Sequence, residues 1–191
     1  MKHQPLSDPH LDRLLTEAEG VYPETDQIVS GLTERQLLWR PSADAWSIAE
    51  CFHHLIVTNR QYYPRVQKAI EETRLRGLTR KGPFRPSWFG RQFIESAGPR
   101  IRFRIKAFKV FQPATQPPAT SPQDFLEQQG TLVELIRLAD GLDLSAIKVP
   151  SPALRFLALR LGEALTMLVV HEYRHLGQAA RVKQAPGFPA S

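Results

Sequence analysis

Apolar residues recur at intervals of three and four along four stretches of the chain, and this spacing predicts four amphipathic helices. The stretches cover residues 9 to about 31, about 48 to 73, about 121 to 141 and about 161 to 183. No convincing strand pattern and no internal repeat accompany them. We therefore expect an all-α four-helix bundle that forms a single domain over 1–191, with its core between about 9 and 184.

Polar residues mark where two of these helices begin. Asp8 stands before Pro9, which places an N-cap acceptor next to a proline suited to the first helical position. Ser47 and Glu50 have the spacing of a capping box at the start of the second helix. Pro64 lies inside that helix and predicts a kink, or a break after the preceding residue.

The connection between the second and third helices is long, irregular and basic. Between 74 and 109 the chain has eleven Lys and Arg residues and one acidic residue, Glu95. The net charge of the whole chain is only +6, so the positive charge is concentrated in this segment. Within this segment, residues 100–109 alternate basic and apolar side chains, which indicates an extended strand-like piece. Four prolines between 112 and 122 indicate a linker, and a connection of this length is typical of a lid or binding loop.

The basic segment supports a second functional interpretation. Its arginines and lysines are interleaved with aromatic residues that could stack on bases, which would suit a non-catalytic module that binds nucleic acid or another anionic partner, although this is not the function we favour. The simpler alternative is a solvated connector whose aromatic side chains form a hydrophobic seam against the bundle. The aromatic residues concerned are Phe84, Trp88, Phe89, Phe93 and Phe103.

Composition restricts the class of protein and the compartment in which it is expected. Hydrophobic residues make up 42% of the chain and charged residues 23%, which are ordinary globular values and exclude wholesale disorder. No apolar run is long enough to span a membrane, and the N-terminus lacks the apolar region of a signal peptide. The single cysteine, Cys51, cannot form an intrachain disulfide and suits a reducing compartment. We expect a cytoplasmic protein without a membrane partner.

Two histidines in the last helix have metal-ligand spacing. His171 and His175 are four residues apart, so their imidazoles lie on one helix face and can bind one cation together. The same face carries apolar residues and therefore points into the bundle. A buried pair must be either metal-bound or hydrogen-bonded, because unpaired buried polar groups are costly. Both possibilities remain open from spacing alone.

The second helix offers a third ligand. His53 and His54 are adjacent, so they point about 100° apart and only one of them can face the interior. His54 shares the apolar side with Cys51 and Tyr62, whereas His53 lies nearer the rim. We therefore expect His54 to complete a three-histidine site.

Three neutral imidazoles would leave a coordination position open for water or a thiol. Near them, Glu172 is a candidate general base, although a solvated side chain is the simpler expectation, and Gln178 is a candidate orienting residue. Asn59 and Tyr62 are candidate substrate-binding residues. The string from His171 to His175 also fits the zincin protease signature His-Glu-x-x-His, but residues 176–191 contain no His, Asp or Glu as a third ligand.

Two motifs resemble those of a known family. Trp46-Ser-Ile-Ala-Glu-Cys-Phe-His-His-Leu55, preceded by Leu37-Leu-Trp-Arg-Pro41, resembles the second-helix signature of the DinB-like superfamily. His171-x-x-x-His175-Leu-Gly-Gln178 is similar to the fourth-helix signature of the same superfamily. The motifs occur in the family's order, and the resemblance extends from about residue 10 to 183.

The resemblance carries its own expectations. Members of this family are cytoplasmic bacterial bundles of up-down-down-up topology, commonly homodimeric, described as metal-dependent enzymes. Matched position by position, the family's ligands would be His54, His171 and His175, and the ion would be zinc or nickel. The implied chemistry on a small-molecule substrate is a transferase reaction with a low-molecular-weight thiol as cosubstrate, or hydrolysis.

Overall fold

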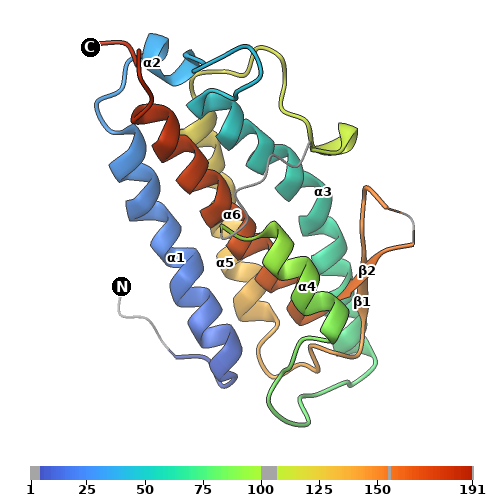
Figure 1. Ribbon diagram of the computed structural model, residues 1–191. Coiled ribbons are helices and arrows are strands. Elements are labelled where there is room, and N and C mark those ends of the chain that lie inside the picture. Colours follow the sequence, from blue (N-terminus) through green and yellow to red (C-terminus); the bar gives the residue numbers. More distant parts are fainter. Residues whose placement is uncertain (1–4, 100–106, 155, 191) are drawn as a thin grey trace.

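The structure is a computed structural model that describes residues 5–99, 107–154 and 156–190. Most of the described residues are helical, and the expectation of an all-α protein is confirmed (Figure 1). The elements in chain order are α1 (Pro9–Val29), α2 (Glu34–Leu38), α3 (Ile48–Leu75), α4 (Trp88–Ala97), the 3-10 helix η1 (Lys109–Phe111), α5 (Ser121–Leu138), β1 (Lys148–Pro150), β2 (Ala158–Arg160) and α6 (Leu161–Lys183).

Four long helices form the bundle. α3 packs against α5 and α6, and α1 packs against the same two helices, so α1 and α3 lie on one diagonal and α5 and α6 on the other. Followed by colour from blue to red, α1 runs up, α3 and α5 run down and α6 runs up (Figure 1). This is the up-down-down-up arrangement, in which the parallel helices α3 and α5 need a connection that returns along the whole bundle.

The predicted caps are present at the helix starts. The Asp8 side chain accepts hydrogen bonds from the backbone amides of His10 and Leu11, and Ser47 and Glu50 form the expected reciprocal capping box. Of the two outcomes expected at Pro64, a kink or a break, the break is wrong, because α3 continues through Pro64 to Leu75. Packing of α3 against two neighbours outweighs the one backbone hydrogen bond that proline removes.

The core has two parts along the bundle axis. One cluster lies where α1, α5 and α6 meet the far half of α3 and the two short strands. The other lies where the first turns of α3 meet the ends of α1 and α6, and includes Phe52, Phe125 and Cys51. The turns of α3 and α6 that carry the histidines lie where these two clusters meet.

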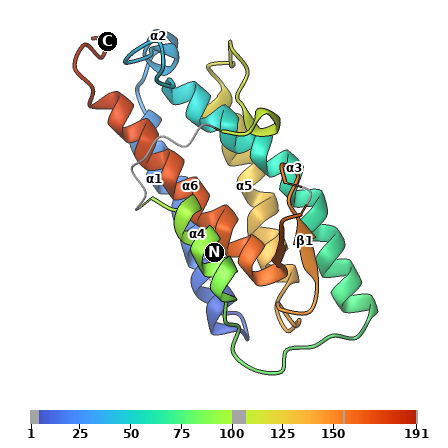
Figure 2. The same cartoon turned by 45° about the vertical axis from the view of Figure 1, so that its right-hand side comes forward.

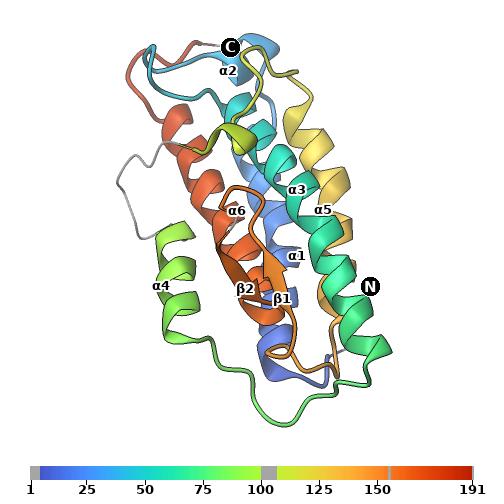
Figure 3. The same ribbon diagram turned by 90° about the vertical axis from the view of Figure 1, so that its right-hand side faces the viewer.

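The connection between α3 and α5 is more regular than its sequence suggests. It contains a ten-residue helix, α4, which packs against α6, and the short helix η1, which lies against α3. The expected extended piece over 100–109 lies mostly outside the described residues, and its last residue, Lys109, begins η1. Figure 3 shows the two strands in front of the bundle and α4 at its left edge, beside α6.

A small hairpin was also missed. β1 and β2 pair antiparallel in the register Lys148–Arg160, Val149–Leu159 and Pro150–Ala158. Each strand has only three residues, of which one is buried, so the sequence offers too short a period to recognise. In the described part of the chain, no helix combines the length and apolar character needed to cross a bilayer.

Candidate metal centre

The three predicted histidines lie together between two antiparallel helices. His54 stands in the second turn of α3, and His171 and His175 stand one turn apart on the facing side of α6. Their ligand-capable ring nitrogens lie within 4.8 Å of one another. Figure 2 shows α3 and α6 side by side along the bundle. The site thus joins residues 117 positions apart in the sequence (171 minus 54).

The geometry of the nitrogens fits a metal ion. Nε2 of His171 lies 3.2 Å from Nε2 of His54 and 3.1 Å from Nε2 of His175. Two nitrogens bound tetrahedrally to one Zn²⁺ at its usual bond length lie about 3.3 Å apart. Three lone pairs that converge at this distance repel each other unless a proton or a cation lies between them. The donor set therefore fits a divalent ion.

Burial keeps these imidazoles uncharged and available as ligands. It lowers the pKa of His54 to about 4, partly offset by the hydrogen bond to a backbone carbonyl. It also lowers the pKa values of His171 and His175 well below the ordinary value, and the neighbouring histidines and Arg174 act in the same direction. His171 as a residue is partly buried, whereas His54 and His175 are buried.

A backbone carbonyl orients His54. Nδ1 of His54 lies 2.5 Å from the carbonyl oxygen of Phe111 in η1, so Nδ1 carries the proton and donates it to this acceptor. Nε2 is left with its lone pair toward the other two histidines. The Nδ1 atoms of His171 and His175 have no such acceptor among the described residues. The connection between α3 and α5 thus contributes to the site through its backbone.

The ring of Trp46 lies against the imidazoles of His54 and His175. Its centroid lies 4.9 Å from that of the His54 ring and 5.8 Å from that of the His175 ring. The loop that carries Trp46 is held by Arg40, whose guanidinium donates two hydrogen bonds to the buried carboxylate of Glu50. The capping box of α3 therefore also fixes a wall of the site.

Glu172 does not behave as expected. It is completely buried, where a solvated side chain was expected, and it accepts a hydrogen bond of 3.1 Å from Nε2 of Gln129 on α5. Burial raises the pKa of Glu172 to about 8, although Gln129 and Asn59 act in the opposite direction. Asn59 on α3 is 1% exposed, so it lies in the interior near Glu172 instead of lining an open pocket.

The other candidates take different places. Tyr62 is buried and its ring stacks on that of Phe111, with 6.0 Å between centroids. Gln178 contacts His175, and this contact opposes the lowering of the pKa of His175. Cys51 is buried in the core near the start of α3, and burial raises the pKa of its thiol far above the ordinary value.

Sequence reasoning missed three contributors. The Phe111 carbonyl has no sequence signal, because every residue has one and this one lies 57 positions from its partner. The contact of the Trp46 ring with His54 and His175 has no sequence signal either, because Trp46 lies in the loop before α3. Arg174 could have been found, since it lies three residues after His171 and so on a neighbouring part of the same helix face.

The aromatic residues of the basic segment divide into two groups. Phe84 and Phe93 pack against the core, as the hydrophobic-seam alternative expects, and Phe103 lies outside the described residues. Trp88 and Phe89 are exposed at the start of α4.

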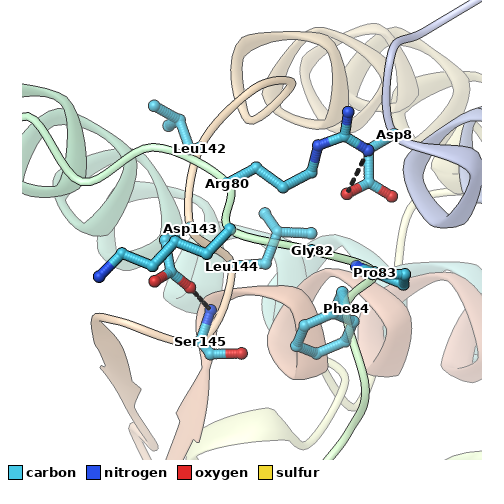
Figure 4. A pocket seen from close by; sticks show the side chains of 10 residues that line it. Asp8, Arg80, Gly82, Pro83, Phe84, Leu142, Asp143, Leu144 and Ser145 are labelled. Atoms are coloured by element: carbon cyan, nitrogen blue, oxygen red, sulfur yellow. Dashed lines mark hydrogen bonds and ion pairs between the residues drawn. The ribbon is translucent and has the colours of Figure 1, made fainter.

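A separate hollow of about 270 Å³ opens at the bundle end where α1 begins (Figure 4). Three of the charged side chains that line it, Asp8, Arg80 and Asp143, have polar partners. Arg80 lies 3.8 Å from the Asp8 carboxylate, and Asp143 accepts a 2.9 Å hydrogen bond from the amide of Ser145. None of the three histidines lines it.

Comparison with known proteins agrees with this geometry. The family model of the DinB superfamily matches residues 17–179. The chain belongs to the DinB superfamily. Among solved structures, this DinB protein is similar to YfiT from Bacillus subtilis, with 18% sequence identity, a TM-score of 0.62, and coverage of 99% of this chain and 94% of YfiT. YfiT is described as a probable metal-dependent hydrolase with an unusual four-helix bundle topology. No match was found among curated protein sequences.

Proposed function

We propose that this DinB protein is a metal-dependent enzyme, a hydrolase of a small molecule, with His54, His171 and His175 as its ligands. The observation that carries the proposal is the convergence of three uncharged imidazoles, in which Nε2 of His171 lies 3.2 Å from Nε2 of His54 and 3.1 Å from Nε2 of His175. The description of YfiT as a probable metal-dependent hydrolase supports the same class. Zinc or nickel suits an all-imidazole donor set, and a homodimer is part of the proposal.

Bound there, the ion would supply Lewis acidity and an open coordination position. The chain's own residues would orient the ligands and exclude water. The Phe111 carbonyl keeps the proton of His54 on Nδ1, so that Nε2 is always the free nitrogen. Trp46 lies over His54 and His175 and excludes water from that side. Gln178 contacts His175 from the following turn and helps to hold its ring.

A second possible reaction at the same metal site is a thiol-dependent transfer instead of hydrolysis. The one cysteine of the chain is buried and its pKa is strongly raised by burial, so Cys51 cannot supply a thiolate nucleophile. Any reactive thiol must therefore come from a low-molecular-weight cosubstrate. Dependence of turnover on added thiol separates the transferase from the hydrolase.

The deciding experiment measures metal per chain in the purified, untagged protein after exposure to Zn²⁺ or Ni²⁺. We expect about one ion per chain in the wild type and almost none in His54→Ala or His171→Ala, because two imidazoles cannot hold the ion as tightly as three. His53→Ala is the matched control, since this neighbouring histidine lies outside the cluster. Far-ultraviolet circular dichroism verifies that each variant stays helical.

Two results would contradict the proposal. One is a wild-type protein that takes up neither Zn²⁺ nor Ni²⁺. The other is a His171→Ala variant that retains a full equivalent of metal, which would place the ion elsewhere.

A further inference from the structure

The start of α4 and the β1–β2 hairpin are joined by one buried side chain. The carboxylate of Glu163 accepts hydrogen bonds of 2.7 Å from the amide of Ser87 and 2.9 Å from the amide of Arg160. Ser87 is the N-cap residue of α4 and Arg160 is the last residue of β2. Both elements also pack against α6 (Figure 3). Residues that precede and begin α4 therefore lie next to the base of the hairpin.

The hairpin places two cations opposite each other. Lys148 of β1 pairs in register with Arg160 of β2, and both lie on the outer face, because the buried residues of the strands are Val149 and Leu159. Like charges directly opposite each other in an antiparallel pair are destabilising. Neither cation forms an ion pair with a carboxylate of the described residues, and the sequence from 148 to 160 contains no Asp or Glu. An anion bound over this pair would remove the repulsion.

The start of α4 adds two more cations and two aromatic rings. Arg85 precedes the helix and Arg91 lies in its first turn; both are exposed, and neither has an ion pair in the described part of the chain. Trp88 is 78% exposed and Phe89 is 51% exposed. Arg91 follows Trp88 by three residues, so this cation and this ring are neighbours on the helix surface.

This combination of groups fits a single strand of nucleic acid. The cations attract phosphates, and the exposed indole of Trp88 offers a ring face on which an unpaired base can stack. The bases of a duplex are already stacked on each other and do not present such a face. A lipid bilayer fits less well, because Trp88 and Phe89 occupy successive helix positions, point about 100° apart and cannot enter a flat surface together.

We propose that the surface formed by Arg85, Trp88, Arg91, Lys148 and Arg160 binds single-stranded nucleic acid, with its cations on the phosphates and Trp88 against a base. None of these residues belongs to the histidine cluster, so the inference does not depend on the proposed metal-dependent function. The two hairpin cations are the part of this surface that lies outside the basic segment between 74 and 109.

The test measures the fluorescence anisotropy of a fluorescein-labelled thymidine oligomer of about twelve nucleotides, titrated with the full-length protein at about 50 mM salt. The variants are Lys148→Gln, Arg91→Gln, Trp88→Ala and Trp88→Phe. Arg35→Gln is the matched control, since Arg35 is an exposed cation on α2, at the opposite end of the bundle from the start of α4 (Figure 1). Circular dichroism verifies that each variant is folded.

Contacts of the four cations with phosphates predict that the affinity falls about 50-fold between about 50 and about 200 mM salt. Lys148→Gln and Arg91→Gln should each reduce the slope of log K against log salt by about 0.7. Trp88→Ala should weaken binding about tenfold without changing this slope, and Trp88→Phe, which keeps a ring, should retain most of the affinity. Arg35→Gln should bind as the wild type does.

Four results would overturn the inference. The first is a wild type that does not bind the oligomer at about 50 mM salt. The second is an equal loss of affinity in Arg35→Gln and Lys148→Gln, which would show attraction to the net charge of the whole chain. The third is a duplex of the same length that binds as tightly as the single strand. The fourth is binding to phosphatidylserine vesicles that exceeds binding to the oligomer and is lost in Trp88→Ala, which would assign the surface to lipid.

Discussion

Two imidazoles of the cluster, His54 and His175, lie against groups from other parts of the chain. The Phe111 carbonyl bonds to His54, Trp46 lies against both rings, and Gln178 lies close to His175. These contacts orient the two rings before any ion binds, which reduces the entropy cost of forming the site.

Trp46 should report metal binding through its fluorescence. Its ring lies 4.9 Å from that of His54, so Cu²⁺, Ni²⁺ or Co²⁺ bound to the histidines should quench its emission. Trp39 packs against Phe188 and Trp88 lies exposed on α4, so neither touches the cluster. Titration of the wild type should give strong quenching that Trp46→Phe abolishes and Trp88→Phe leaves in place. Equal quenching in Trp46→Phe would show that the ion binds elsewhere.

The stability of the metal-free protein should depend on pH through the buried imidazoles. Burial lowers the pKa of His54 to about 4, whereas the unfolded chain protonates near 6.5. Between these values the unfolded state binds more protons, so stability is lost as the pH falls below about 6.5. Each such histidine contributes up to ~1.4 kcal/mol per pH unit. Urea unfolding of chelator-treated protein at about pH 7.5 and about pH 5.5 measures this loss. His54→Asn should show a smaller difference; an identical one would contradict the assignment.

Among the elements, α4 shows how the irregular connection is anchored. The buried carboxylate of Glu163 accepts hydrogen bonds from the backbone amides of Ser87, at the start of α4, and Arg160, at the start of α6. One side chain thus joins the beginnings of two helices, and Arg174 joins the end of α4 to the middle of α6. The position of α4 is therefore determined at both ends by α6.

Gly90 makes this anchoring possible. A Cβ atom at Gly90 would lie 2.2 Å from Oε1 of Glu163, whose carboxylate cannot move away without breaking its two amide bonds. Gly90→Ala should lower the free energy of unfolding by about 2 kcal/mol, measured by urea denaturation.

The control is Gly130→Ala inside α5. A Cβ atom there meets nothing closer than the Tyr22 hydroxyl at 3.7 Å, so alanine should stabilise the helix by about 0.5–1 kcal/mol. A Gly90→Ala protein as stable as Gly130→Ala would show that α4 is not held in this way.

The same elements show what a sequence reveals. The long helices were predictable because their apolar faces repeat over many turns, and the proximity of His54 to His171 followed from the faces they occupy. α4 was not predictable, since its ten residues include Gly90 and three large aromatics, and its stability comes from contacts with α6. The position of Glu172 was also missed, because its hydrogen-bond partner Gln129 comes from another helix, 43 positions away.

At the scale of the whole molecule, the candidate ion would connect helices that belong to different diagonals of the bundle. His54 belongs to α3 and the other two histidines to α6. Binding to the folded state alone therefore stabilises the contact between these helices. The size of the effect follows from mass action.

Metal should raise the thermal stability of the protein. At a free ion concentration ~100 times the dissociation constant, the gain is about 2.7 kcal/mol, which corresponds to about 5–10 °C in Tm for a chain of this length. Calorimetry of the chelator-treated protein with and without Zn²⁺ measures the shift. His54→Ala should show no shift and His53→Ala the full one. A full shift in His54→Ala would contradict a site shared by α3 and α6.

The diagonal placement of the helices also governs the order of events during biosynthesis. α1 and α3 leave the ribosome first, yet each packs against α5 and α6 and not chiefly against the other. No helical hairpin of sequence neighbours can therefore shield the first half of the chain, whose apolar faces stay open to chaperones until α5 and α6 emerge. The last two imidazoles arrive on α6, so acquisition of the ion is among the final steps in the maturation of the protein.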